Sequence, residues 1–208
     1  MKSALLVFAL LLALPARAEN PATNRVALFD GQTLTGWQPV AFDGGGAIRV
    51  STHGVLEIGA GDSLTGLVCT NPPARMNYEI TLDARRISGD DFFCGLTFPV
   101  GTNCCTLILG GWGGSVIGVS SLDGADASEN ETGATFAFEQ NRWYASRLRV
   151  TPDKIEAWLD QKRFVNLDTE GRRLGMRRGD IEKCMPLGLA TWKTRGELRN
   201  IYLQKLSN

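Results

Sequence analysis

The chain has 208 residues, 43% of them hydrophobic, with 22 basic and 22 acidic side chains. This length suits one domain of generous size. No basic stripe is present, so nucleic acid is not expected as a partner. The 24 glycines and 8 prolines predict frequent turns and short segments between them.

The N-terminus has the features of a secretory signal peptide. Lys2 precedes an apolar run over residues 4–14, and Ala16-Arg17-Ala18 matches an A-x-A cleavage site. The run is too short to span a bilayer comfortably, and no later stretch is apolar enough to do so. We therefore predict a signal peptide at residues 1–18 and a single domain over residues 19–208.

Cleavage there fixes the charge and location expected of the mature chain. It removes Lys2 and Arg17, which leaves 20 basic against 22 acidic residues and a net charge of −2. We expect the mature protein to be periplasmic or secreted, with no transmembrane segment after cleavage.

His53 is the only histidine and lies in "VSTHGVLEI". A single histidine excludes multi-histidine metal sites and leaves a serine triad only one possible base. The His-Gly pair is typical of a turn between two strands, and we interpret His53 as a solvated turn residue.

Three segments alternate apolar and polar residues with a period of two, which predicts half-buried antiparallel strands: 77–84, 154–160 and 199–206. No window of a dozen residues shows a convincing helical period. The residues thus predict an all-β protein, and a sandwich of two antiparallel sheets hides the apolar faces of such strands.

Asp90 and Asp91 precede "FFCGLTF", a segment with apolar residues on both faces. The pair marks the mouth of a buried strand, and two interpretations stay open. Asp91 is a candidate catalytic carboxylate, or the pair is a turn with a solvated charge.

The five cysteines are expected to be small apolar core residues: Cys69, Cys94, Cys104, Cys105 and Cys184. Their odd number leaves at least one thiol over unless chains pair. In a hairpin of residues 92–98 and 103–109, Cys94 and Cys105 would share a face only diagonally, which is a poor geometry for a disulfide. No C-x-x-C metal spacing is present.

The tract "LILGGWGGSVIGVSSLDGADASENET" (107–132) surrounds Trp112 with four glycines. Small neighbours leave an indole face open and let the backbone approach a ligand. Trp112 with Asn130 and Glu131 would suit a sugar ring and its hydroxyls. The alternative is that Trp112 packs into the core beside a β-bulge.

Acidic residues follow this tract and are weak candidates for a divalent cation such as calcium: Asp123, Asp126, Glu129 and Glu131. Their spacing lacks the EF-hand pattern, so a plain polar loop is the competing interpretation. The Glu-x-Asp-x-x-Glu run of retaining glucanases is absent from the chain.

The other tryptophans divide into two groups. Trp192 and Trp158 are secondary candidates for sugar contact, Trp158 because it lies on the polar face of its strand. Trp37 and Trp143 are assigned to the core or a sheet edge.

The segments "VALFDGQTLTGWQ" (26–38), "NRWYASRLRVTPDKIEAWLDQKRFVNLDT" (141–169) and "LGLATWKTRGELRNIYLQKL" (187–206) together resemble the 3-keto-disaccharide hydrolase domain family. The middle of the chain, with "DDFFCGLTFPVG" (90–101), looks like a planctomycete-type branch of that family. The similarity extends over nearly the whole mature chain.

The resemblance implies a concanavalin-like jelly roll, a carbohydrate ligand and hydrolysis of glycosides oxidised at C3. A C3 ketone acidifies the C2 proton, so one base can generate an enolate that expels the C1 substituent. Asp91 or Glu131 is the expected base. Asn130, backbone amides of residues 110–114 or a bound cation would hold the enolate oxygen.

Two further hypotheses stay open beside a 3-keto-glycoside hydrolase. One is a non-catalytic carbohydrate-binding module of the same fold that uses Trp112 and its polar neighbours. The other, weaker, is a structural surface domain without a small ligand.

Overall fold

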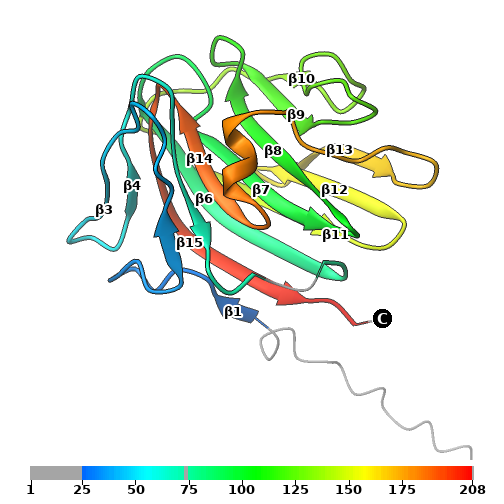
Figure 1. Cartoon of the computed structure of the whole chain (residues 1–208), viewed down its shortest axis with the longest axis horizontal. Helices are drawn as coiled ribbons and strands as arrows, with labels where there is room; N and C mark the ends of the chain where they lie inside the picture. The colour runs from blue at the N-terminus through cyan, green and yellow to red at the C-terminus, as the bar shows by residue number, and fades with distance from the viewer. Residues whose placement is uncertain (1–24, 73–74, 208) are drawn as a thin grey trace, which may run out of the picture.

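The structure is a computed structural model that describes residues 25–72 and 75–207. It is a sandwich of two antiparallel sheets (Figure 1), so the predicted jelly-roll sandwich is confirmed. The predicted signal peptide at 1–18 lies outside the described residues. No helix in the described part of the chain is long and apolar enough to cross a membrane.

The first sheet, sheet A, has the order β13-β12-β11-β6-β15-β4-β3, with β1 also paired to β15. Its strands are β1 (Arg25–Ala27), β3 (Ile48–Val50), β4 (Leu56–Ile58), β6 (Tyr78–Ser88), β11 (Tyr144–Val150), β12 (Lys154–Leu159), β13 (Lys162–Asp168) and β15 (Arg195–Lys205). The long strands β6 and β15 pair along most of their length at its centre.

The second sheet, sheet B, has the order β10-β9-β8-β7-β14-β5-β2. Its strands are β2 (Trp37–Pro39), β5 (Leu64–Cys69), β7 (Cys94–Val100), β8 (Asn103–Gly111), β9 (Val116–Ser120), β10 (Ala134–Thr135) and β14 (Gly188–Trp192). A short 3₁₀ helix, η1 (Asp180–Cys184), lies in front of this sheet in Figure 1.

The core lies between the sheets and follows the predicted alternation. In β6, Tyr78, Ile80, Leu82 and Ala84 are at most 2% exposed, while Thr81 and Asp83 are half-buried on the outer face. The alternation in β12 and β15 puts their apolar residues inside in the same way. Apolar burial is the main driving force for such a fold.

Strands β7 and β8 form the expected hairpin, with Cys94 opposite Leu109 and Cys105 opposite Phe98. All five cysteines are buried free thiols. Burial raises the pKa of Cys94, Cys105 and Cys184 to about 12, so their thiolates are not available as nucleophiles at neutral pH.

Candidate functional site

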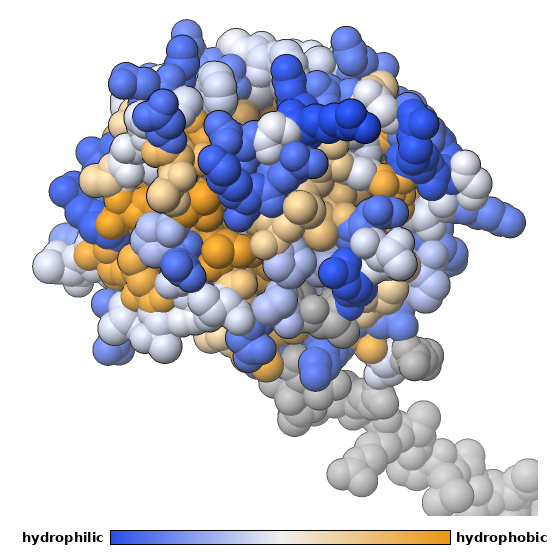
Figure 2. All heavy atoms as spheres, viewed as in Figure 1, coloured by the Kyte–Doolittle hydropathy of each residue, from blue (hydrophilic) through white to orange (hydrophobic). Residues whose placement is uncertain are grey.

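A cavity of about 490 Å³ opens on the outer face of sheet B, within the size range of small-ligand pockets. Figure 2 shows this face from the viewpoint of Figure 1, with a hydrophobic patch among hydrophilic residues near its middle. The lining residues are Leu64, Asp91, Phe92, Thr106, Ile108, Trp112, Ser120, Arg177, Arg178, Asp180, Ile181 and Trp192. We call it the sheet B pocket.

Trp112 lies in the tight turn that joins β8 to β9. The amide of Gly114 donates to the carbonyl of Gly111 at 3.2 Å, and the two central residues, Trp112 and Gly113, have φ values of 48° and 82°. Both residues are therefore in the left-handed region, which glycine adopts readily and other residues rarely. An L-residue such as Trp at this position is strained, and such strain is concentrated at functional sites.

A buried arginine explains why the turn is so rich in glycine. Arg86 is 7% exposed, and its Nη2 donates to the carbonyl oxygens of Gly114 at 2.6 Å and Gly110 at 3.3 Å. A Cβ on Gly110 would overlap this guanidinium, and one on Gly114 would lie 3.1 Å from Nη1. The glycines therefore let the cation approach the backbone and fix the turn that presents Trp112.

Two phenylalanine rings also lie near the guanidinium of Arg86. Its guanidinium carbon lies 5.2 Å from the ring centroid of Phe93 and 5.7 Å from that of Phe138. Desolvation by burial lowers the pKa of Arg86 from its ordinary value, while the nearby charges of Asp91 and Asp90 favour its charged form. Nε of Arg86 is buried and has no hydrogen-bond partner within residues 25–72 and 75–207.

Two indoles form the exposed rim of the pocket. Trp112 and Trp192 are each 37% exposed, and both line the cavity. The amide of Trp192 donates to the carbonyl of Phe92 at 3.1 Å, which links the end of β14 to the segment before β7. Exposed indole faces beside hydroxyl and charged groups are suited to the C–H faces of sugars.

Asp91 supplies a carboxylate to the same pocket. Its amide donates to Oγ1 of Thr194 at 3.1 Å, and its Oδ1 accepts from the amide of Phe92 at 2.7 Å. A Cβ on Gly111 would lie 3.8 Å from this Oδ1, so the carboxylate is adjacent to the Trp112 turn. Asp91 is half-buried, whereas Asp90 is exposed and does not line the pocket.

Positive charge comes from the segment before η1. Arg177 and Arg178 both line the pocket. Nη1 of Arg177 is 2.9 Å from Oδ2 of Asp126, whose Oδ1 accepts from the hydroxyls of Ser120 and Ser121 at 2.9 and 3.0 Å. Asp126 thus anchors both Arg177 and Ser120 at the wall of the cavity.

Asn130 and Glu131 do not line the sheet B pocket. Nδ2 of Asn130 donates to three backbone carbonyls, those of Val119, Ala125 and Asp126, so its amide holds the loop after β9 together. Glu131 forms an ion pair with Arg172. These two candidates therefore lie apart from Asp91, Trp112 and Trp192.

The acids considered for a cation are paired with other side chains or exposed. Asp123 pairs with Arg172 at 2.7 Å, Asp126 is engaged as described above, and Glu129 is exposed. Among residues 25–72 and 75–207, no group of three or more His, Cys, Asp or Glu side chains is arranged to hold a metal ion.

The remaining tryptophans lie elsewhere. Trp37 is 5% exposed in the core, and its Nε1 donates to the carbonyl of Leu28 at 2.6 Å. Trp143 lies under Arg85 and Arg199, whose guanidinium carbons are 4.5 and 4.1 Å from its ring centroid. Trp158 belongs to the outer face of sheet A.

The family model of the 3-keto-alpha-glucoside-1,2-lyase-like domain matches residues 24–204. The chain belongs to this family. The match extends over almost all described strands of this 3-keto-alpha-glucoside-1,2-lyase-like domain, while its assignment to a planctomycete-type branch stays a prediction. None of the curated proteins is a significant match.

Solved structures share the fold at low sequence identity. A proposed glycosyl hydrolase from Parabacteroides distasonis is 16% identical, with a TM-score of 0.56, covering 89% of this chain and 95% of that one. The carbohydrate-binding module CBM66 from Bacillus subtilis is 12% identical, with a TM-score of 0.52 and coverages of 82% and 96%. The VIP36 exoplasmic/lumenal domain, in its Ca²⁺/Man3GlcNAc-bound form, is 11% identical, with a TM-score of 0.60 and 89% of each chain covered.

Proposed function

We propose that this protein is an exported carbohydrate-active enzyme that cleaves glycosides oxidised at C3, with the sugar bound in the sheet B pocket. The observation that carries the proposal is that Asp91 lines the same cavity as two exposed indoles. Family membership supports the 3-keto substrate class. The predicted signal peptide supports export.

In this mechanism Asp91 removes the C2 proton of the bound 3-keto sugar. The electron pair of that C–H bond moves toward C3 and places negative charge on the ketone oxygen. Arg177 and Arg178 supply positive charge in the same pocket, and a fixed cation stabilises such an oxyanion.

Collapse of the enolate then breaks the C1–O bond. The C3 carbonyl reforms, a C1–C2 double bond appears, and the departing oxygen takes a proton from water. Addition of water across C1–C2, with hydroxide to C1 and the Asp91 proton returned to C2, releases the free 3-keto sugar and restores the carboxylate. The elimination alone gives a lyase, and both steps together give a hydrolase.

The test is turnover of a nitrophenyl 3-keto-glucoside. We expect Asp91→Asn to lower kcat by at least about 100-fold, because general-base catalysis contributes roughly 10²–10⁴ in rate. The affinity for the unoxidised glucoside, measured by calorimetry, should change by less than about twofold. Asp90→Asn is the matched control, since Asp90 is the adjacent acid and does not line the pocket.

Full activity in Asp91→Asn would refute the assignment of the base. A wild-type protein that binds glucosides without turning over any 3-keto-glucoside would instead establish the second candidate, a non-catalytic carbohydrate-binding module. The observation that favours this alternative is the fold shared with CBM66, together with the open indole rim.

A further inference from the structure

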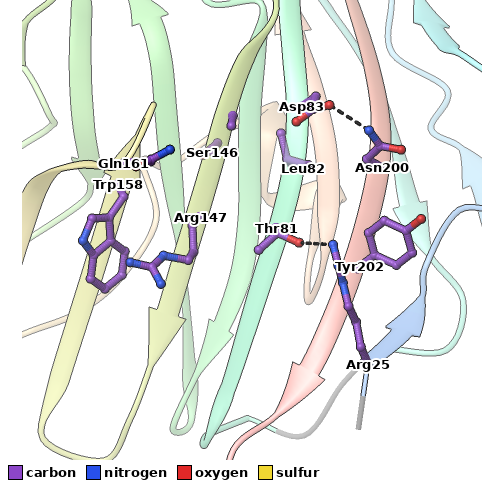
Figure 3. A pocket seen from close by; sticks show the side chains of 11 residues that line it. Arg25, Thr81, Leu82, Asp83, Ser146, Arg147, Trp158, Gln161, Asn200 and Tyr202 are labelled. Carbon is purple, nitrogen blue, oxygen red and sulfur yellow. Dashed lines mark hydrogen bonds between the residues drawn. The ribbon is translucent and has the colours of Figure 1, made fainter. Parts of the chain in front are cut away.

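A second cavity, of about 710 Å³, lies on the outer face of sheet A, on the far side of the sandwich from the sheet B pocket. Trp158 on β12 and Tyr202 on β15 stand at its two sides, and Thr81 of β6 lies between them (Figure 3). We call it the sheet A trough. It is not used by the proposed function.

The register of the strands creates this trough. Arg147 is paired with Trp158 on one side and with Thr81 on the other, and Thr81 is in turn paired with Tyr202. These residues form one row across four strands. Because neighbouring Cβ atoms in such a row are only about 5 Å apart, the short Thr81 side chain leaves a depression between longer ones.

Each side of the trough carries an arginine stacked on an aromatic ring. Cζ of Arg147 lies 3.7 Å from the ring centroid of Trp158, and Cζ of Arg25 lies 3.9 Å from that of Tyr202. Stacking fixes the plane of a guanidinium and leaves its N–H groups, which point outward within that plane, free to donate. Nη2 of Arg25 already donates to Oγ1 of Thr81 at 3.1 Å.

The positive charge of neither stacked guanidinium is fully neutralised by a carboxylate of the described residues. Within the described part of the chain Arg25 has no carboxylate partner. The carboxylate nearest to Arg147 is Glu79, at 3.8 Å, and the same oxygen is bound more closely by Arg149, at 3.0 Å. An anionic group placed in the trough would gain charge-assisted hydrogen bonds that the protein itself does not supply.

The upper end of the trough in Figure 3 is polar. Oδ2 of Asp83 accepts from Nδ2 of Asn200 at 2.8 Å and from Nε of Arg199 at 3.2 Å. A carboxylate and an amide at this end are suited to sugar hydroxyls, while the arginines suit an acid group on the same ligand.

We infer that the sheet A trough is a second saccharide site, selective for oligosaccharides that carry carboxylate groups, such as hexuronate oligomers. The two stacked arginines bind the carboxylate, and Asp83 with Asn200 binds hydroxyls. The site works independently of the sheet B pocket and of the reaction proposed there.

Calorimetry on the intact protein tests this inference with a hexuronate trisaccharide and a neutral trisaccharide. The acidic ligand should bind and the neutral one should bind at least about tenfold more weakly at this site, with affinity for the acid falling as salt rises. Arg25→Gln and Arg147→Gln should each lower the affinity for the acidic ligand by about tenfold, because each removes one charge-assisted hydrogen bond.

Two matched variants control the experiment. Arg163→Gln removes an arginine of the same sheet that is paired with Glu156 at 2.7 Å and does not line the trough, so affinity for the acid should be kept. Trp112→Ala should also leave this affinity unchanged, because that residue belongs to the sheet B pocket.

Three results would overturn the inference. The first is equal affinity for acidic and neutral trisaccharides, and the second is full affinity in the Arg25→Gln, Arg147→Gln double variant. The third is inorganic polyphosphate binding as tightly as the hexuronate, since that would make the trough a general anion site. All of these variants change exposed or half-buried side chains, and unchanged thermal unfolding verifies their fold.

Discussion

The outer faces of the two sheets differ in kind although their inner faces share one core. The outer face of sheet B carries apolar and hydroxylated residues in an indole-rimmed pocket, among them Ile108, Thr106 and Ser120. The outer face of sheet A carries a network of ion pairs, in which acids such as Glu79 and Glu197 each contact two arginines. The comparison shows that outward-facing residues, which the core leaves unconstrained, decide what each face can bind.

The largest effect on stability is expected at the turn that presents Trp112. Gly110 and Gly113 have φ values of 80° and 82°. Of the two, only a Cβ at Gly110 would meet Arg86, whereas one at Gly113 would meet no atom of the described residues within 4 Å. Gly110→Ala should cost about 3 kcal/mol or more, from backbone strain plus overpacking. Gly113→Ala should cost only about 1 kcal/mol, from strain alone.

Urea unfolding of the two glycine variants measures this difference. Equal costs would mean that the guanidinium of Arg86 does not constrain the turn. The loss in Gly110→Ala should also be accompanied by weaker sugar binding in the sheet B pocket, since the turn carries Trp112.

The ion-pair network on sheet A can be tested at Glu197, which is 5% exposed. Its Oε2 accepts from Nε and Nη2 of Arg85 at 2.8 and 2.6 Å. Glu197→Gln should lower the free energy of unfolding by about 2 kcal/mol, because charged partners then lose their counter-charge in a partly buried site. Glu139→Gln should change it by less than about 0.5 kcal/mol, since that pair with Arg142 is exposed.

Denaturation at low and high salt checks this prediction. The effect of Glu197→Gln should shrink only slightly as salt rises, because a partly buried ion pair is screened less than an exposed one. A loss in Glu139→Gln as large as in Glu197→Gln would contradict the role given to burial.

Substitution of single tryptophans should show which face of the sandwich binds the neutral sugar. Trp112→Ala and Trp192→Ala should each lower the affinity for a neutral glucoside by about tenfold, which is the loss expected for one aromatic contact. Trp158→Ala should leave that affinity within about twofold, because Trp158 lies on sheet A. Titration followed by calorimetry measures all three, and an effect of Trp158→Ala equal to the others would place the neutral sugar on the wrong face.

The smallest effect concerns acid pH at the loop after β9. Hydrogen bonds from the amide of Arg173 and then from the side chain of Arg172 lower the pKa of Asp123 below its ordinary 3.8. The pKa of Glu131 is lowered by its own backbone amide and then by Arg172. Carboxylates with lowered pKa stabilise the fold above their unfolded pKa, and this contribution is lost as pH falls through the folded value.

Arg172→Gln should therefore raise both pKa values toward their ordinary ones in an NMR titration, and stability at acid pH should change only slightly. Asp123 should stay partly depressed because the Arg173 amide remains. No movement of either pKa would contradict the ion pairs assigned to Arg172.

The fold could be predicted from the sequence because apolar and polar residues that alternate with a period of two indicate which side of a strand is buried. Residues 77–84 and 199–206 show this, and they overlap the two paired central strands of sheet A, β6 and β15. Glycines on both sides of Trp112 left two interpretations open, an exposed ring or one packed in the core, and the ring is exposed.

The residues of the sheet B pocket could be predicted from the sequence only in part. Asp91, Trp112 and Trp192 stand out locally, and all three line one cavity. Arg177 and Asp180 carry no local signal, because they reach the pocket through the path of a loop far along the chain. Asn130 and Glu131 were grouped with Trp112 by closeness in sequence, whereas the loop directs them to backbone carbonyls and to Arg172.

The most direct test of the account is a crystal structure of the Asp91→Asn variant soaked with a 3-keto-glucoside. We predict a pyranose between Trp112 and Trp192 with its C2 hydrogen facing residue 91. A sugar bound only on the face of sheet A, or one whose C2 faces away from residue 91, would contradict it.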